Sequence, residues 1–236
     1  MPAEGLNILK TAHPPMTKVV FFMDGRAFLF VNGELSNGEA VRKRIQPTDF
    51  LIGVDGGVKH LLKLEMRPHL MIGDFDSVEE KTLSEMKSLG IEILRFSSKK
   101  DEADLELAIY LALERGFKKI IIVAATGGRI DQTLGNIALL SDPNLADLDI
   151  RMFDGQTELF IIRDQAELFG KPGDGVSLIP LCSQVVGVNT THLLYPLHNE
   201  TLFQHKTRGI SNVMQAATAK VQIQSGELLC IHIFQM

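Results

Sequence analysis

The chain has 236 residues, of which 45% are apolar and 22% are charged, and its formal net charge at pH 7 is −5. This length and apolar fraction are enough for one large domain or for a medium and a small one, and they argue against a disordered chain. The mildly acidic charge, without a long basic block, argues against nucleic acid as a partner, because such binders gain affinity by neutralising phosphates.

The cysteine content and the hydropathy pattern indicate a cytoplasmic protein. Cys182 and Cys230 are the only cysteines and form no CxxC motif, so neither a disulfide framework nor a zinc site is expected. No apolar run reaches the length of about 18 residues that a membrane span needs. Residues 1–16 lack the features of a signal peptide and are predicted to be a loose N-terminal tail.

Strands and helices are predicted to alternate over the first two thirds of the chain. Short apolar runs predict strands at 27–31, 50–54, 70–72, 91–96, 119–125 and 150–153. Helical periodicity predicts helices at 58–65, 78–89, 101–115 and 131–140. This alternation is typical of an α/β fold, and it predicts a mostly parallel, Rossmann-like sheet domain over residues 17–164.

The pattern changes near residue 165. Little helical periodicity follows, and short alternating or apolar runs occur at 175–179, 185–188, 193–195, 219–223 and 228–234. Glycines and polar pairs separate these runs, as in all-β domains. A second, smaller β domain is therefore predicted over residues 165–236.

The stretch from residue 71 to 77, MIGDFDS, holds two closely spaced carboxylates at the end of an apolar run. In an extended backbone Asp74 and Asp76 would point the same way and repel each other, and a divalent cation would relieve this repulsion. Carboxylate oxygens of this kind suit Mg²⁺. Ser77 is a candidate N-cap for the following helix. The alternative is an acidic turn that caps a helix and has no chemical role.

Further acidic residues follow other predicted strands or begin helices. Asp55 precedes a Gly-Gly pair, Asp101 and Asp104 share one face of a helix start, and Asp131 follows Arg129 by two residues. Each has a local explanation: a turn at Asp55, compensation of a helix dipole at Asp101, or an ion pair between Asp131 and Arg129. Together they indicate a ligand at the carboxyl ends of the strands, where open α/β sheets bind ligands.

The glycines at 127 and 128 predict a phosphate-binding loop. Gly127 and Gly128 let the backbone approach a phosphate closely, and the N-terminus of the following helix favours an anion. Neither GxxxxGK[ST] nor GxGxxG occurs, so P-loop and dinucleotide chemistry are disfavoured. The acids and this loop together indicate a metal–polyphosphate site.

Six motifs, in order and spacing, resemble those of the thiamine pyrophosphokinase family, which transfers a diphosphate from ATP to thiamine. They are Asp55-Gly-Gly57, Gly73-Asp-Phe-Asp-Ser77, Lys100-Asp-Glu-Ala-Asp104, Gly127-Gly-Arg-Ile-Asp131, Leu194-Tyr-Pro-Leu197 and Gly209-Ile-Ser-Asn212. The resemblance implies a nucleotide-binding α/β domain, a β-sandwich domain, Mg²⁺ dependence and a homodimer. It also implies that thiamine lies between subunits and contacts the β domain.

Under this resemblance, the acidic residues are catalytic and hold the metal. Asp74, Asp76 and Asp104 are expected to hold Mg²⁺ on the β- and γ-phosphates of ATP. Asp55 is expected to support a second ion or to orient a metal-bound water. Asp104 or Asp76 would accept the proton of the thiamine hydroxyl, whose oxygen attacks the β-phosphorus and releases AMP.

The remaining motif residues are expected to bind the two substrates. Lys100 and Arg129 would neutralise phosphate charge, Gly127 and Gly128 would donate backbone hydrogen bonds, and Asp131 belongs to the same nucleotide-binding group. The thiamine residues are expected to be Ser211 and Asn212, which would bind the aminopyrimidine, and Tyr195, which would pack on a thiamine ring and suit the cationic thiazolium.

Three positions depart from the usual family pattern, and other functions stay open. Ala103 stands where the family usually has Thr, Gln132 where it usually has His, and Tyr195 where many members have Trp. One alternative is a diphosphokinase that acts on a hydroxymethyl-pterin. Another is a catalytically weak thiamine- or nucleotide-binding protein. A dimeric structural module is a third, but it leaves the acids at the strand ends unexplained.

Overall fold

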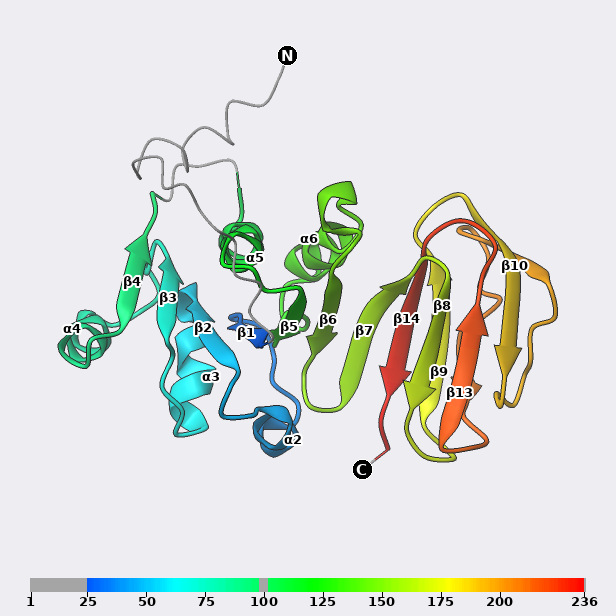
Figure 1. The fold of residues 1–236 in the computed structure, drawn as a ribbon, viewed down its shortest axis with the longest axis horizontal. Helices are drawn as coiled ribbons and strands as arrows, with labels where there is room; N and C mark the ends of the chain where they lie inside the picture. Colours follow the sequence, from blue (N-terminus) through cyan, green and yellow to red (C-terminus); the bar gives the residue numbers. More distant parts are fainter. Residues whose placement is uncertain (1–24, 98–101, 236) are drawn as a thin grey trace, which may run out of the picture. The chain divides into compact units, whose positions relative to one another are not determined.

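The computed structural model describes residues 25–97 and 102–235, which fall into two compact units (Figure 1). The first unit comprises the described residues up to 32 together with 47–120, and the second comprises 33–46 and the residues from 121 onward. The predicted tail at residues 1–16 lies outside the described residues, as do Lys100 and Asp101. The predicted division of the chain into residues 17–164 and 165–236 stays a prediction.

The first unit contains a parallel sheet. Its strands are β1 (Arg26–Phe30), β2 (Phe50–Val54), β3 (Leu70–Gly73) and β4 (Glu92–Arg95). They pair in parallel in the order β1-β2-β3-β4. The first three strands are almost wholly buried along their length, as expected for a parallel sheet covered on both faces. The predicted strands in this part of the chain are confirmed.

Helices connect and cover these strands. They are the short 3-10 helix η2 (Asp55–Gly57), α3 (Val58–Lys63), α4 (Glu80–Ser88) and α5 (Asp104–Glu114). Helices α3 and α5 contact β1 and β2. Leu83 and Met86 of α4 pack with Met71 of β3 in a buried cluster. Strand β5 (Lys119–Val123) follows α5 and crosses the division between the units at residue 120.

The second unit contains three helical segments and nine strands among its described residues. The helices are α2 (Gly38–Arg44), α6 (Ile130–Leu139) and the short η3 (Pro143–Leu145). The strands are β6 (Asp149–Phe153), β7 (Thr157–Ile162), β8 (Gln165–Phe169), β9 (Gly175–Pro180), β10 (Gln184–Thr191), β11 (Glu200–Phe203), β12 (Asn212–Val213), β13 (Thr218–Gln222) and β14 (Leu228–Ile233).

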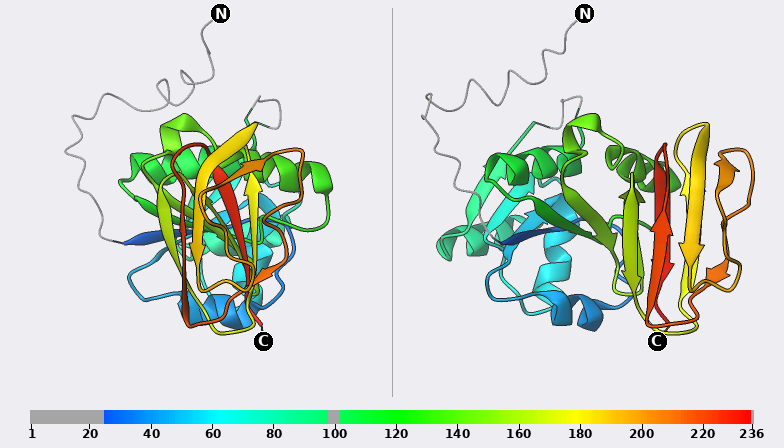
Figure 2. Two further views of the ribbon diagram at one scale, coloured as in Figure 1. Left: turned by 90° about the vertical axis from the view of Figure 1, so that its right-hand side faces the viewer. Right: turned by 45° about the vertical axis from the view of Figure 1, so that its right-hand side comes forward.

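These strands form a β-sandwich (Figure 2). One antiparallel layer has the order β12-β9-β14-β7-β6, and the other has the order β11-β10-β13-β8. Buried side chains from both layers, among them Leu178 of β9 and Val221 of β13, share one hydrophobic core. The predicted all-β region is therefore confirmed, in addition to the α/β sheet.

Two local predictions differ from the structure. Helix α2 was not expected, because its sequence GEAVRKR buries only Val41 and so lacks an apolar stripe; Asn37 caps it through a hydrogen bond from the Ala40 amide. Residues 193–195 do not form a strand, since only Leu193 makes an isolated bridge, to Met214. None of the helices in the described part of the chain is long and apolar enough to cross a membrane.

Candidate functional site

Three carboxylates converge at the carboxyl ends of β2 and β3. Asp55, Asp74 and Asp76 each offer an oxygen, and these oxygens all lie within 4.8 Å of one another. Asp55 follows β2, and the other two follow β3, the neighbouring parallel strand. Parallel pairing thus brings together two segments that are separated by about twenty residues in the sequence. We call these three residues the acidic cluster.

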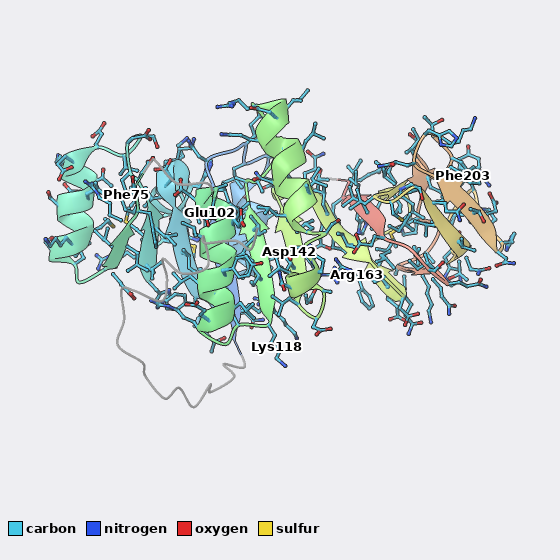
Figure 3. All side chains as sticks on the ribbon, turned by 90° about the horizontal axis from the view of Figure 1, so that it is seen from above. Phe75, Glu102, Lys118, Asp142, Arg163 and Phe203 are labelled. Atoms are coloured by element: carbon cyan, nitrogen blue, oxygen red, sulfur yellow. The ribbon has the colours of Figure 1, made fainter. Side chains whose placement is uncertain are left out.

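Phe75 fixes the direction of its two acidic neighbours. Its side chain is 3% exposed and packs with Val58, Met71, Leu83 and Met86, and it lies beside α4 (Figure 3). Its backbone has φ of 60°, which is unusual for a bulky residue. The buried ring anchors the middle of the Asp-Phe-Asp segment, so the flanking carboxylates remain outside the core.

Glycines allow the close approach that places Asp55. A Cβ on Gly57 would lie 1.9 Å from the Phe30 carbonyl oxygen, and a Cβ on Gly73 would lie 3.0 Å from Cα of Asp55. Asp55 itself has φ of 45°, a strained value for a residue other than glycine. Strain of this kind is concentrated at functional sites, where surrounding packing maintains it. Asp55-Gly-Gly forms the 3-10 helix η2, and the functional role of Asp55 stays a prediction.

Ser77 joins the two segments instead of capping a helix. Its hydroxyl donates a 3.0 Å hydrogen bond to Oδ2 of Asp55. Helix α4 begins at Glu80 with Glu79 at the N-cap position, and no side chain accepts a capping hydrogen bond there. The predicted N-cap role of Ser77 is therefore wrong, because the N-cap position is Glu79, two residues later, and the Ser77 hydroxyl bonds Asp55 instead.

The electrostatics of the acidic cluster favour a cation. The negative charge of Asp74 is the main cause that raises the pKa of Asp76 above its usual value, with smaller contributions from burial and from Asp55 and Asp104. The Oδ1 atom of Asp55 is buried and has no hydrogen-bond partner. Uncompensated carboxylate oxygens that point at one another are suitable ligands for a hard cation such as Mg²⁺.

Asp104 lies near the acidic cluster but is not part of the group of oxygens within 4.8 Å. It is the first residue of α5, and its charge contributes to the raised pKa of Asp76. The structure thus groups Asp55 with Asp74 and Asp76, whereas the sequence suggested Asp104 as the third metal ligand. The metal-binding role of Asp104 stays a prediction.

The predicted phosphate loop lies in the second unit, between β5 and α6. Gly127 and Gly128 have φ of 84° and 66°. Arg129 donates two hydrogen bonds to Asp131, of 3.1 and 2.5 Å, and both side chains are exposed. This bond is the main cause that lowers the pKa of Asp131. The local ion pair considered for these two residues is present, and Asp131 thereby orients the guanidinium group.

The predicted thiamine residues lie at one edge of the β-sandwich. The buried side chain of Asn212 accepts a hydrogen bond from the Tyr195 amide (2.9 Å) and donates one to the Tyr195 carbonyl (2.7 Å). These side-chain bonds occupy the Tyr195 backbone, while Leu194 still donates a backbone hydrogen bond to the Val213 carbonyl. The Tyr195 side chain is 56% exposed, and Ser211 is also exposed. Tyr195 is thus presented to solvent while Asn212 holds its backbone.

Two polar side chains near the acidic cluster were not predicted. The Nζ of Lys59, on α3, donates a hydrogen bond to the Asn32 side chain, and a Cβ on Gly56 would lie 2.8 Å from both the Asn32 side chain and the Ser77 hydroxyl. Asn32 lies beyond the end of β1. Its place in the sequence, an Asn-Gly pair after an apolar run, indicated only a turn.

Comparison with protein families identifies both parts of the chain. Residues 41–152 match the family model described as thiamin pyrophosphokinase, catalytic domain. Residues 161–229 match the model described as thiamin pyrophosphokinase, vitamin B1 binding domain. The first match includes the acidic cluster and the Gly127 loop, and the second includes Tyr195 and Asn212.

Individual proteins agree with these matches. The chain is 31% identical to thiamine pyrophosphokinase of Bacillus subtilis over 76% of this chain and 85% of that protein. The crystal structure of thiamine pyrophosphokinase from Bacillus subtilis superposes with a TM-score of 0.80 and 25% identity over 90% of this chain and all of that one. Thiamin pyrophosphokinase from Candida albicans, at 18% identity and a TM-score of 0.75 over 89% of each chain, shares the fold.

Proposed function

We propose that this chain, which belongs to the thiamin pyrophosphokinase family, transfers a diphosphate group from ATP to the hydroxyl of thiamine and releases AMP. The family supports the formation of thiamine diphosphate. The observation that carries the proposed use of ATP is the acidic cluster at the ends of β2 and β3, because a bound divalent cation would neutralise the diphosphate group that is transferred. The parallel order β1-β2-β3-β4 supports a Rossmann-like nucleotide-binding sheet.

Mg²⁺ fits the donor set of the acidic cluster, since all its members are carboxylates and one buried oxygen of Asp55 lacks a partner. Asp55, Asp74 and Asp76 would hold it, and Asp104 would support it from the start of α5. When bound, the ion supplies positive charge that neutralises the phosphate oxygens. Ser77 orients Asp55 through its hydroxyl, and Phe75 keeps the two flanking carboxylates outside the core.

In the proposed reaction the hydroxyl oxygen of thiamine forms a bond to the β-phosphorus of ATP. The bond between this phosphorus and the oxygen that bridges to the α-phosphorus breaks, and AMP leaves with that oxygen. Asp104 or Asp76 accepts the hydroxyl proton. Arg129, oriented by Asp131, neutralises charge on the phosphates, and Lys100, outside the described residues, has the same proposed role.

The vitamin is proposed to bind at the exposed edge of the β-sandwich. Tyr195 packs on a thiamine ring, and Ser211 hydrogen-bonds the aminopyrimidine. Asn212 is proposed to act mainly through Tyr195, because both ends of its amide already bond the Tyr195 backbone. Exposed apolar side chains at Leu194 and Ile210 support an organic ligand at this edge.

A homodimer in the cytoplasm is the proposed state of the protein. Helix α6 supports a second copy as partner: none of its ten residues is buried, and Ile130 and Leu134 are 77% and 63% exposed. Exposed apolar side chains on one helix support a contact with a second copy. The two free cysteines suit a reducing compartment.

The first test is an AMP-release assay with purified protein, ATP and Mg²⁺, with and without thiamine. Thiamine-dependent AMP with an equal amount of thiamine diphosphate is the expected result. If AMP forms only when a hydroxymethyl-pterin is added, the pterin and not thiamine is the acceptor. If calorimetry detects binding of thiamine or ATP but no turnover occurs, the chain is a binding protein. Ala103 and Gln132 would then be the first positions to replace with the usual family residues.

A further inference from the structure

The predicted phosphate loop already carries an anionic group from the chain itself. The Gly128 amide donates a 3.0 Å hydrogen bond to Oε1 of Glu34. Gly127 and Gly128 have successive positive φ values, which glycine adopts without strain. Glu34 lies 94 positions earlier in the chain than Gly128, and no motif drew attention to it.

The Glu34 segment is attached to this loop by its backbone as well. The Glu34 amide donates to the Thr126 carbonyl, and the Gly33 amide donates to the Ala124 carbonyl, both at 2.8 Å. The approach is tight, because a Cβ on Gly33 would lie 2.4 Å from the Ala124 carbonyl oxygen. The chain after β1 therefore runs directly beside the chain after β5.

The Glu34 side chain lies across the backbone of Gly127. A Cβ on Gly127 would lie 2.6 Å from Cδ of Glu34 and 2.7 Å from its Cβ and Cγ. Gly127 thus needs to be glycine for two reasons, its positive φ and this contact. The segment of Gly33 and Glu34 is held by two backbone hydrogen bonds, by side-chain packing on Gly127 and by the hydrogen bond from the Gly128 amide, so it is a fixed part of the loop.

We propose that Glu34 is a positioning residue for the nucleotide site, whose carboxylate fixes the Gly127–Arg129 loop by accepting the Gly128 amide. This inference rests on the proposed function, and it changes one assignment made from the sequence: the Gly128 amide holds the loop instead of donating to phosphate. Arg129 follows directly and is the group of this loop that meets the phosphates. Glu34 thereby lowers the entropy that the loop loses when ATP binds.

The hydrogen-bond acceptor, not the charge, carries this role. Glu34→Ala removes the acceptor and the packing on Gly127, and we expect it to raise the KM for ATP roughly 5- to 20-fold, as loss of one hydrogen bond together with this packing would. Glu34→Gln keeps an Oε1 acceptor at the same reach and should stay within about twofold of wild type. The KM for thiamine should be unchanged in both.

The full-length chain is tested with both variants and with Glu39→Ala as the control, since Glu39 is an exposed glutamate on α2 that pairs only with Lys43 among the contacts described. KM values for ATP and thiamine are measured, and hydrogen exchange of the Gly128 amide is followed by NMR. Exchange should accelerate in Glu34→Ala and remain slow in wild type, Glu34→Gln and Glu39→Ala.

Three results would overturn the proposal. A lower KM for ATP in Glu34→Ala would show that Glu34 competes with the phosphate for the loop. An equal rise of the KM for ATP in Glu34→Gln would assign the effect to the charge of Glu34. An unchanged exchange rate of the Gly128 amide in Glu34→Ala would show that the hydrogen bond to Glu34 does not protect it. The exchange measurement needs no turnover. Absence of thiamine-dependent AMP release in wild type would therefore contradict the proposed function, and the exchange measurement would still test whether Glu34 holds the loop.

Discussion

The Ser77 hydroxyl donates a hydrogen bond of 3.0 Å to Oδ2 of Asp55, so the segment after β3 is joined to the residue that follows β2. This contact leaves Oδ1 of the same carboxylate buried and without a hydrogen-bond partner. One oxygen is thus held by the protein, and the other is left available to a ligand. Ser77 acts on the proposed metal ligand without belonging to the ligand set.

Ser77→Ala is expected to weaken the dependence of activity on Mg²⁺. Loss of a partner that orients a metal ligand lowers metal affinity or activity roughly 10- to 100-fold. The Mg²⁺ concentration that gives half-maximal activity should therefore rise, and a titration of activity against Mg²⁺ measures it. Ser77→Thr keeps the hydroxyl and is the control; an unchanged Mg²⁺ requirement in the alanine variant would show that Asp55 needs no such support.

Asp74→Asn is expected to abolish transfer, with a loss of at least about 100-fold, because it removes a carboxylate from the proposed ion. The substitution also relieves repulsion within the acidic cluster, so the variant without metal should melt at or above the temperature of wild type. Thermal melts with and without Mg²⁺ measure this: the ion should raise the Tm of wild type and not that of Asp74→Asn. The matched control is Glu80→Gln, an exposed acid at the start of α4. Full activity in Asp74→Asn would contradict the proposed role of Asp74 as a metal ligand.

Tyr195→Ala is expected to raise the KM for thiamine roughly 3- to 30-fold, which is the range of a partly desolvated contact between a cation and an aromatic ring. The KM for ATP should not change, because the residue lies at the edge of the β-sandwich. Tyr195→Phe keeps the ring and should behave as wild type. Steady-state kinetics with each substrate varied in turn decide the matter, and equal effects on both substrates would argue against a specific contact with the vitamin.

Asn212→Ala tests whether the Tyr195 backbone needs its two hydrogen bonds from this amide. The variant should raise the KM for thiamine as Tyr195→Ala does, and combining the two substitutions should add little, because they act through one unit. The double-mutant cycle is measured with the same kinetics. Additive effects would instead indicate that Asn212 contacts thiamine directly.

Ile130→Glu and Leu134→Glu are expected to weaken the proposed dimer by at least about tenfold, because each would place a charge in an apolar contact. Sedimentation equilibrium over a range of protein concentrations measures the association. Glu substitution at exposed Phe203, on β11 in the other layer of the sandwich, is the control. A wild-type chain that sediments as a monomer at all concentrations would contradict the dimer itself.

The free energy of unfolding is expected to fall as the pH drops from 7.5 to 5. Burial lowers the pKa of His232, although the charges of Asp174 and Glu158 oppose this, and Arg44 adds to the lowering. Below the unfolded value of about 6.5 the unfolded chain binds a proton that the folded chain does not, so stability present above that pH is lost as the folded pKa is approached.

Urea titrations at several pH values measure this dependence. His232→Gln should flatten the slope between pH 6.5 and 5, whereas His205→Gln, at an exposed position, should leave it unchanged. A wild-type stability that rises toward pH 5 would mean that Asp174, 3.4 Å from the imidazole, outweighs burial and raises the pKa instead.

Much of the architecture was predictable from the sequence because its signals are local. The buried runs at 50–54 and 70–72 are continuous and apolar, and they form β2 and β3 of the parallel sheet. The alternating runs after residue 165 form the sandwich. Helix α2 escaped prediction because a seven-residue helix with one buried side chain has no periodic stripe.

The candidate site was predictable only in part. The two-residue spacing of Asp74 and Asp76 identified the acidic pair, but the sequence offered Asp104 as its companion, whereas the structure places Asp55 among the nearest oxygens. Strand pairing decides this, because β2 and β3 are neighbours in the sheet. No local pattern encodes which strands will be neighbours.

The sequence alone therefore determined the fold class, the family and the chemical character of the site, since apolar periodicity and motif spacing are properties of short segments. Tertiary structure alone decided the contacts of Ser77 with Asp55, of Asn212 with Tyr195 and of Glu34 with Gly128. Each joins segments far apart in the chain. Such contacts form only when the burial of apolar strands brings those segments together, so the polar residues that make them carry no signal of their own in the sequence.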